Sequence, residues 1–402
     1  MEKSIRKEIS NSEFEYILDI FSLEKDKKVN LKLELFDDPR VSYLLLKSDI
    51  KTIDDLEKRI KTVVGNIDLI ERIKKRFIVD EDLHLPYDLR NDLLESNSKV
   101  GLFIGAGVSK LLKIPLWEEL ALEAIKYLRE KGDINFDEEI KIKNEKWTPK
   151  QILSIFHRRI NDKAEIEKFY RDKLKGKLNE YGNPYELLYE LEKVLARPLL
   201  KITTNLDLEW ERVLKQRIKE EEKNFYEDGS VKKPPFVIYT HTQTGNFTKY
   251  QEIREDILYQ IHGNINNLDE AVITMSDYVE KYRDDNGLKG FLAEVFRNYT
   301  MIFIGTGLQE FEILEHVLKG AAREHYALVG TYWGDKNLFR VKKEYFSDLR
   351  ISKVIPYYLD FHSYNRLIFV LQKWIEEIRA DRAKRLNYYE NIRLIDEVLN
   401  ED

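Results

Sequence analysis

Four short apolar segments in the middle of the chain each run directly into a cluster of glycine or polar residues that could do chemistry. The clusters are Gly105-Ala106-Gly107, Thr203-Thr204-Asn205, His262-Gly263 and Gly305-Thr306-Gly307. Short apolar runs that end in such a turn are typical of buried parallel strands. Ligands of open parallel sheets bind beyond the carboxyl ends of the strands, so the four clusters are predicted to converge on one site.

The two double-glycine clusters have the composition of phosphate-binding loops. In Gly105-Ala106-Gly107-Val108-Ser109 the glycines would let the backbone approach an anion, and a following helix would offer free N–H groups. Gly107→Val is expected to block nucleotide binding by filling that space. Lys110 and Glu310 stand where a full dinucleotide fingerprint has its third glycine. Each cluster alone is therefore equally consistent with a tight turn that holds no ligand.

Asn205, Asp207 and His262 are the polar side chains that stand at these strand ends. Taken singly, an Asn and an Asp at such a place are commonly a helix cap and a loop acid, and a lone histidine is usually structural. His262 differs from the other histidines because it stands directly at a strand-to-glycine switch. Asn205 and His262 are both expected outside the core. No HExxH motif or paired-histidine spacing occurs, so these groups are not predicted to bind a metal.

The composition argues against several classes of function. The chain has 402 residues and a net charge of −6, whereas sequence-independent nucleic-acid binding needs clustered Lys and Arg. The basic stretches Arg72–Arg76 and Arg379–Arg385 have acids nearby and are interpreted as solvated helix faces. No apolar run is long enough to span a membrane and Met1–Ser10 lacks an apolar signal core, so a cytoplasmic location is expected. The absence of cysteine excludes disulfides, a cysteine nucleophile and a Cys-rich zinc ribbon.

Strands alternate with helices along most of the chain. This alternation predicts an α/β fold with a Rossmann-like, mostly parallel sheet flanked by helices, and with helical N- and C-terminal additions. Helices are expected from Pro115 to about Lys131, over residues 148–195, after Asp207 and near Phe311–Leu318. The expected strands are Val100–Ile104, Leu199–Thr203, Pro235–Thr240, Ile257–Ile261, Ala271–Thr274, Met301–Ile304, Tyr326–Thr331 and Lys353–Tyr358.

The same pattern predicts three regions. Residues 1–95 form a helical N-terminal region, residues 96–362 a catalytic domain with a helical insertion at about 118–195, and residues 363–402 one or two C-terminal helices. The apolar positions of Leu367–Ile378 must be buried, either on the protein's own sheet or in an interface. Symmetric self-association is a common use of such surfaces, so a homo-oligomer is predicted.

The order of the motifs resembles that of the sirtuin superfamily. The resemblance is carried by Gly-Ala-Gly-Val-Ser, then Ile-Pro, then Thr-Thr-Asn-Leu-Asp, then His-Gly. The later stretches Ile273–Tyr278 and Phe303–Gly307 look like the bacterial sirtuin-like branch of that superfamily. Together these motifs cover about residues 98–330. Members of this branch act in antiphage defence, where they drain cellular NAD.

The resemblance implies a Rossmann-like site that takes NAD as its substrate. It implies that Asn205 positions the ribose, the nicotinamide or the attacking water, that His262 is the general base, and that Asp207 supports them. An ordinary histidine pKa near 6.5 suits such a base at cellular pH. The residues that it places around NAD are Gly105, Ala106, Gly107, Ser109, Thr204, Gly305 and Thr306.

The chain also departs from the protein-deacylating sirtuins. It has no cysteine for their four-Cys zinc module, so no zinc is expected, and Leu116-Trp117 follow Pro115 where they have Asp-Phe-Arg. Without an acyl acceptor, water is the natural nucleophile, which favours an NAD glycohydrolase that releases nicotinamide and ADP-ribose. The alternatives are a non-catalytic NAD or ADP-ribose-type nucleotide sensor, an NAD-dependent protein deacylase, and an assembly protein with a dead site. The chain length and helical flanks resemble the members paired with a HerA-type ATPase, which makes such an ATPase a candidate partner.

Overall fold

The computed structural model describes residues 83–145, 147–228, 236–245, 247, 252–284, 286–307, 311–319, 324–332, 336–359 and 363–399. Most of the predicted helical region at residues 1–95 therefore lies outside the described residues. Its described end contains helix α6, Tyr87–Leu94, which buries Leu89 and Leu93.

The chain divides into two compact units. The larger unit holds Leu85–Leu328, Tyr345–Val354 and Leu371–Asp402, and the smaller holds Val329–Glu344 and Ile355–Val370 together with Met1–His84. All the candidate site residues belong to the larger unit. The region boundaries at residues 95 and 362 stay predictions.

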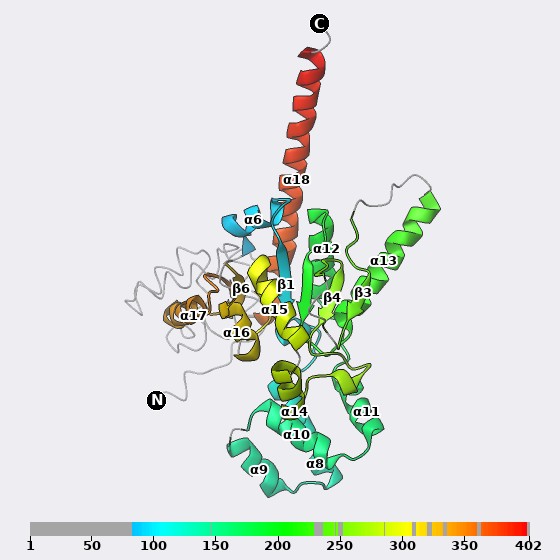
Figure 1. The fold of residues 1–402 in the computed structure, drawn as a ribbon, viewed down its shortest axis with the longest axis vertical. Coiled ribbons are helices and arrows are strands. Elements are labelled where there is room, and N and C mark those ends of the chain that lie inside the picture. Colours follow the sequence, from blue (N-terminus) through cyan, green and yellow to red (C-terminus); the bar gives the residue numbers. More distant parts are fainter. Residues whose placement is uncertain are drawn as a thin grey trace, which may run out of the picture. The chain divides into compact units, whose positions relative to one another are not determined.

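A seven-stranded parallel sheet forms the centre of the fold (Figure 1). The strand order β3-β4-β2-β1-β5-β6-β7 puts β1 in the middle, with the next strands in sequence on one side and the last three on the other. This arrangement confirms the predicted α/β class with a Rossmann-like sheet. The strands are β1 Val100–Ile104, β2 Leu200–Thr203, β3 His241–Gln243, β4 Ile257–Gln260, β5 Thr300–Ile304, β6 Tyr326–Thr331 and β7 Lys353–Tyr358.

The register brings the ends of the four central strands level with one another. Ile104 is paired with Thr203 of β2 and with Ile304 of β5, and Thr203 is paired with Gln260 of β4. Every residue of these four strands is buried, as expected for a sheet covered on both faces. The clusters that follow the four strands therefore meet at one edge, as the sequence predicts.

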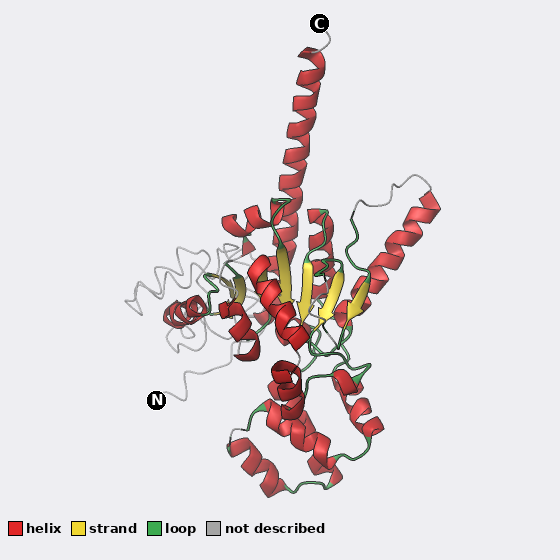
Figure 2. Ribbon diagram, viewed as in Figure 1, coloured by secondary structure: helices red, strands yellow, loops and turns green. Residues whose placement is uncertain are grey.

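Helices surround the sheet, and α8, α9, α10 and α11 gather beyond its carboxyl edge (Figure 2). Thr148 and Asn183 cap α10 and α12, and each is followed by a proline at the first helical position. The remaining helices are α7 Ala106–Lys110, α8 Trp117–Lys131, α9 Phe136–Asn144, α10 Pro149–Arg159, α11 Lys163–Lys173, α12 Pro184–Leu195, α13 Glu209–Asp228, α14 Met275–Val279, α15 Asn286–Asn298, α16 Phe311–Lys319, α17 Lys336–Asp348 and α18 Arg366–Leu399.

Two predicted strands are wrong. Residues 236–240 are irregular, and the edge strand β3 begins only at His241, immediately after the predicted Pro235–Thr240. Ala271–Thr274 is not a strand either, because Thr274 caps α14 and its side chain accepts a hydrogen bond from Asp277 N. In both places the sequence has a short apolar run, but the backbone forms no strand over that length.

The C-terminal flank forms one continuous helix, α18. Its apolar positions Leu371, Trp374 and Ile378 are at most 1% exposed, and Leu367 is equally buried. The apolar face of Leu367–Ile378 is therefore covered by the chain itself, which favours the first of the two alternatives for this segment. Within the described residues, no helix is both long enough and apolar enough to cross a membrane.

A buried ion pair stabilises the amino end of β2. Lys201 and Glu192 have fully buried side chains, and Lys201 Nζ lies 2.8 Å from Glu192 Oε1. Lys201 Nζ also donates to the carbonyl oxygens of Leu199 and Glu255, at 2.8 and 2.7 Å. Glu192 Oε1 accepts a further bond from Leu199 N at 2.7 Å. Burial raises the pKa of Glu192, and the charge of Lys201 opposes this shift.

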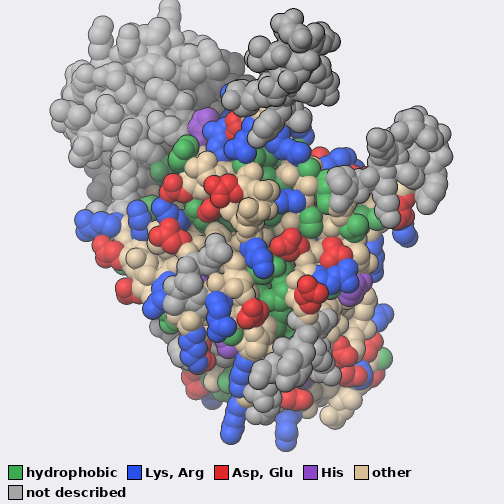
Figure 3. Space-filling model, turned by 45° about the horizontal axis from the view of Figure 1, so that its top comes forward, with side chains coloured by type: hydrophobic (Ala, Val, Ile, Leu, Met, Phe, Trp, Pro, Cys, Tyr) green, Lys and Arg blue, Asp and Glu red, His purple; other side chains and the backbone are tan. Residues whose placement is uncertain are grey.

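Charged side chains of both signs share the surface. On the face drawn in Figure 3, Lys and Arg lie among Asp and Glu. Many of these side chains are paired, for example Lys131 with Glu165 at 2.6 Å and Lys173 with Glu123 at 2.7 Å. Exposed pairs of this kind contribute little to stability, about 0–1 kcal/mol each.

Candidate active site

The two glycine loops at the carboxyl edge pack directly on each other. Gly105 N donates to Ile304 O at 3.0 Å, and Gly107 N donates to Gly305 O at 2.7 Å. A Cβ atom at Gly107 would lie 2.7 Å from Gly305 O and 2.8 Å from Gly305 Cα. Gly305 itself has a φ of 65°, which favours glycine.

This contact changes the reason why position 107 needs glycine. The sequence interpretation reserved the space at Gly107 for a phosphate, whereas the structure fills that space with the backbone of Gly305. Gly107→Val would therefore push the two loops apart before it could touch a ligand. The second loop lies beside the first as predicted, and Thr306 Cα is 2.7 Å from the position of a Cβ at Gly105.

Asn205 is held at the end of β2 by both its backbone and its side chain. Thr203 Oγ1 donates to Ile104 O at 2.8 Å and accepts from Asn205 N at 3.0 Å. The amide nitrogen Nδ2 of Asn205 lies 3.1 Å from Gly105 O and 2.9 Å from Ser109 Oγ. Asn205 is 6% exposed, and its Oδ1 is a buried atom with no hydrogen-bond partner among the described residues. Such an atom costs free energy unless a ligand or water satisfies it.

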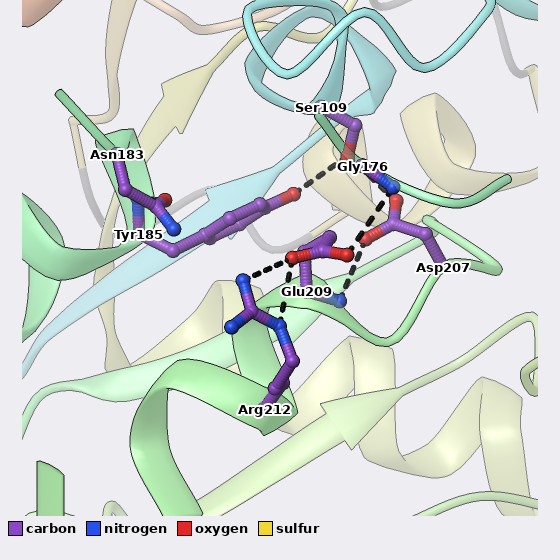
Figure 4. Close-up of polar contacts among 7 residues, drawn as sticks. All are labelled: Ser109, Gly176, Asn183, Tyr185, Asp207, Glu209 and Arg212. Atoms are coloured by element: carbon purple, nitrogen blue, oxygen red, sulfur yellow. Dashed lines mark hydrogen bonds and ion pairs between the residues drawn. The ribbon is translucent and has the colours of Figure 1, made fainter. Parts of the chain in front are cut away.

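Asp207 completes a buried polar cluster with Ser109 and Tyr185 (Figure 4). Ser109 Oγ donates to Asp207 Oδ2 at 2.6 Å and lies 2.7 Å from the Tyr185 hydroxyl. The other carboxylate oxygen of Asp207 accepts from Glu209 N at 3.0 Å. Burial raises the pKa of Asp207 to about 6, although the hydrogen bonds from Ser109 and from Glu209 N oppose the shift.

A pocket opens beside this cluster. Apolar side chains form most of its wall, and Ser109, Asn205 and Asp207 supply its polar groups. Asn205 lines the pocket, and its Oδ1 is a buried acceptor that lacks a partner among the described residues. The lining residues are Ala106, Ser109, Ile114, Pro115, Trp117, Leu120, Leu174, Asn205, Leu206 and Asp207.

Polar contacts fix the two segments that carry the apolar wall. Lys110 Nζ lies 2.6 Å from Glu119 Oε1, and Glu119 Oε2 accepts from Leu116 N at 2.8 Å, which ties the turn before α8 to α7. The segment after α11, which follows Leu174, is tied to α13 by Gly176 N, 3.2 Å from Glu209 Oε1 (Figure 4). The wall is therefore built on fixed elements, as a preformed ligand pocket requires.

His262 lies next to Thr204 but not in the pocket wall. Its side chain is 0% exposed, whereas the sequence interpretation expected it outside the core. Its Nε2 lies 2.7 Å from the Tyr282 hydroxyl, and Tyr278 packs edge-to-face on its ring at 5.3 Å. Burial, together with the charges of Lys150 and Lys281, lowers the pKa of His262 to about 3, although a backbone hydrogen bond at Thr204 opposes the shift. The expected pKa near 6.5 is therefore wrong for this residue.

The structure thus joins most of the predicted site residues into one constellation. The loop Gly105–Ser109, the strand end Thr204–Asp207 and the second loop Gly305–Thr306 adjoin at one edge, and His262 forms a hydrogen bond with the Thr204 backbone. The sequence does not predict Tyr185 as a site residue. Nothing in the local sequence shows that its hydroxyl reaches Ser109, a residue 76 positions away.

Residues 200–348 match the family model of the SIR2-like domain. The matched segment begins at β2 and includes Asn205, Asp207, His262 and Gly305, whereas the first glycine loop precedes it. No curated protein matches the chain. The match supports a Sir2-type family, and SIR2-like domains bind NAD and are usually NAD-dependent enzymes, so NAD-related chemistry in general is indicated. Among the described residues, no group of three or more His, Asp or Glu side chains could hold a metal ion.

Proposed function

We propose that this protein hydrolyses NAD at the nicotinamide–ribose bond and releases nicotinamide and ADP-ribose. The observation that carries the proposal is Asn205 Oδ1, a buried acceptor that is unpartnered among the described residues and belongs to a pocket-lining side chain. It stands beside Asp207 and the Gly105–Ser109 loop, in a chain whose residues 200–348 match a SIR2-like domain. A buried acceptor at this place is what a developing positive charge on the ribose needs.

The reaction that these groups would support is a displacement by water at C1′ of the ribose. The bond from C1′ to the nicotinamide nitrogen breaks, and its electron pair leaves with the neutral nicotinamide. Water forms the new bond to C1′ and loses one proton to the solvent or to a base. Asn205 Oδ1 would stabilise the cationic sugar and orient the water, and the wall of Ile114, Trp117 and Leu174 would limit access of bulk water.

His262 has a smaller part in this proposal than the family resemblance implies. With a pKa lowered to about 3 it is neutral at cellular pH, but it is a weak proton acceptor. It would act near the ribose hydroxyls from its place behind Thr204. The burial of His262 also favours a second candidate function. This is a nucleotide sensor that binds NAD or ADP-ribose without turning it over. A protein deacylase is the third candidate, and the absence of cysteine for a zinc module disfavours it.

The biological setting follows from the resemblance. The proposed role is depletion of cellular NAD in antiphage defence, in the cytoplasm, by a homo-oligomer that a HerA-type ATPase could control. A constitutive NAD hydrolase would harm its own cell, so activity is expected to change when the trigger or partner binds. This role depends on the hydrolase activity, which is tested first.

The test is incubation of the purified protein with NAD, followed by chromatography of nicotinamide and ADP-ribose, with and without the candidate ATPase. Equal amounts of the two products from the wild type, and formation of both about 100- to 1000-fold slower with Asn205→Ala, are expected. NAD that is bound but recovered intact under both conditions would favour the sensor. Nicotinamide release that requires an acylated peptide would favour the deacylase.

A further inference from the structure

The Tyr185 hydroxyl is a buried part of the polar cluster at the carboxyl edge of the sheet. Tyr185 lies in the first turn of α12 and is 1% exposed. Its ring stacks on Trp210 with the centroids 5.8 Å apart. Its hydroxyl oxygen lies 2.7 Å from Ser109 Oγ and 3.1 Å from Asn205 Nδ2. Because packing fixes the ring, the hydroxyl is held against the side chain of Asn205, a residue that lines the pocket.

The hydrogens of this network can be assigned from what each atom can donate or accept. An ionised Asp207 only accepts, so the Ser109 hydroxyl donates to it. Ser109 Oγ then accepts from the Tyr185 hydroxyl, and the Tyr185 oxygen accepts in turn from Asn205 Nδ2. The other hydrogen of Nδ2 goes to Gly105 O. Every hydrogen finds an acceptor, and Asn205 Oδ1 is the atom left for the pocket.

The reversed orientation of the Asn205 amide breaks this order. It would place Oδ1 near Gly105 O, which is also only an acceptor. It would also turn Nδ2 away from the Tyr185 and Ser109 oxygens. Removing the Tyr185 hydroxyl leaves Nδ2 with one acceptor fewer, and it leaves Asn205 Nδ2 as the donor to Ser109 Oγ. The amide would then be free to tilt toward Ser109, with a displacement of Oδ1 in the pocket.

We propose that Tyr185 is a positioning residue for the reaction of this site. Because Asp207 accepts from Ser109, the Tyr185 hydroxyl donates to Ser109 and accepts from Asn205 Nδ2. This hydrogen bond fixes the orientation of the Asn205 amide and so holds Asn205 Oδ1 toward the pocket. Tyr185 does not line the pocket, so it acts through Asn205 and not by touching the substrate. The inference rests on the proposed function, because it gives the unpartnered oxygen its orientation.

The primary experiment compares Tyr185→Phe with Tyr189→Phe. Both tyrosines lie on α12 and both are 1% exposed, so each variant removes one buried hydroxyl from the same helix. Tyr185→Phe is expected to lower kcat about 10- to 100-fold, because small misplacements of a group that acts in the transition state have effects of this size. The KM for NAD should stay within about threefold, since substrate contacts remain. Tyr189→Phe should leave kcat within about twofold of the wild type.

A double-mutant cycle separates positioning from a general loss of structure. If Tyr185 acts through Asn205, the double variant Tyr185→Phe/Asn205→Ala should be no slower than Asn205→Ala alone. Losses in kcat that multiply in the double variant would overturn the proposal. So would a Tyr185→Phe variant whose kcat equals that of Tyr189→Phe.

The outcome for the hydrolase can be told apart from the outcome for Tyr185. A wild type that binds NAD without releasing nicotinamide overturns the proposed function alone. In that case the double-mutant cycle is measured with the Kd for NAD in place of kcat. Tyr185→Phe should weaken NAD binding in the wild-type background and should not weaken it in the Asn205→Ala background. Equal weakening in both backgrounds overturns the positioning role, and a wild type with no affinity for NAD overturns both proposals.

Discussion

Strand β2 has a buried polar cluster at each of its ends. At the amino end, Lys201 Nζ has three acceptors, supplied by Glu192 and by the carbonyl oxygens of Leu199 and Glu255. At the carboxyl end, Asn205 Nδ2 is equally well supplied, but Asn205 Oδ1 has no partner among the described residues and its side chain lines a pocket. Glu192 Oε2 also has no hydrogen-bond partner among the described residues, but Glu192 does not line the pocket.

The difference between the two ends separates stability from function. The ion pair at the amino end is fully buried and is bonded by its own two side chains and by the nearby backbone, so removing one partner leaves a buried charge. The cluster at the carboxyl end directs all of its donors inward and leaves one acceptor for a ligand. A change at the amino end should therefore reduce stability, and a change at the carboxyl end should reduce activity.

Lys201→Met gives the largest expected effect. It leaves the Glu192 carboxylate buried without its cation, and the free energy of unfolding should fall by about 3–5 kcal/mol. The measurement is denaturant unfolding followed by circular dichroism. Lys201→Met/Glu192→Leu replaces both charges by apolar groups and should recover most of the loss. A single variant as stable as the wild type would show that the pair is not a stabilising contact.

Asn205→Ala tests the other end of the strand. Its kcat for NAD should fall about 100- to 1000-fold, the usual effect of removing one preorganised polar group from an active site. Its unfolding midpoint should change far less than that of Lys201→Met. Asn298→Ala, at the end of α15, is the matched control and should keep its activity. If Asn205→Ala proves as active as this control, the open acceptor has no part in the reaction.

The sequence predicts the carboxyl edge of the sheet better than the environment of its residues. The apolar runs Val100–Ile104 and Tyr326–Thr331 are confirmed as strands to the residue, because a short and mostly apolar run leaves a clear signal in the sequence. The burial of His262 could not be predicted in the same way. Tyr278 and Tyr282, which cover it, come from α14 and from a π-helical turn, Glu280–Asp284, that follows it.

The same limit explains the remaining differences. The role of Tyr185 depends on a contact with Ser109 across 76 positions, and a single sequence contains no signal for a contact of this kind. The expected phosphate space at Gly107 is occupied by the backbone of Gly305, from a loop about 200 positions later. Glycine marks a close approach in both interpretations, but the sequence does not say what approaches.

Asp207→Asn should have the smallest effect of the three single variants. It should raise the stability of the fold, whereas Lys201→Met should lower it. Burial raises the pKa of Asp207 from 3.8 to about 6, so the folded protein binds a proton more tightly there than the unfolded chain does. Stability from this group therefore falls as pH rises from about 4 to about 6, and above that range the ionised carboxylate destabilises the fold by about 1–3 kcal/mol. Asp207→Asn removes the charge and should raise the unfolding midpoint at pH 8, with little effect at pH 4. Thermal unfolding at the two pH values measures this, and kcat at pH 8 should fall because Ser109 loses a carboxylate acceptor.

A variant that is less stable than the wild type at pH 8 would mean that the hydrogen bonds from Ser109 and Glu209 N outweigh the cost of burying the carboxylate. The charged group at the carboxyl end of β2 would then stabilise the fold, as the ion pair at the amino end does.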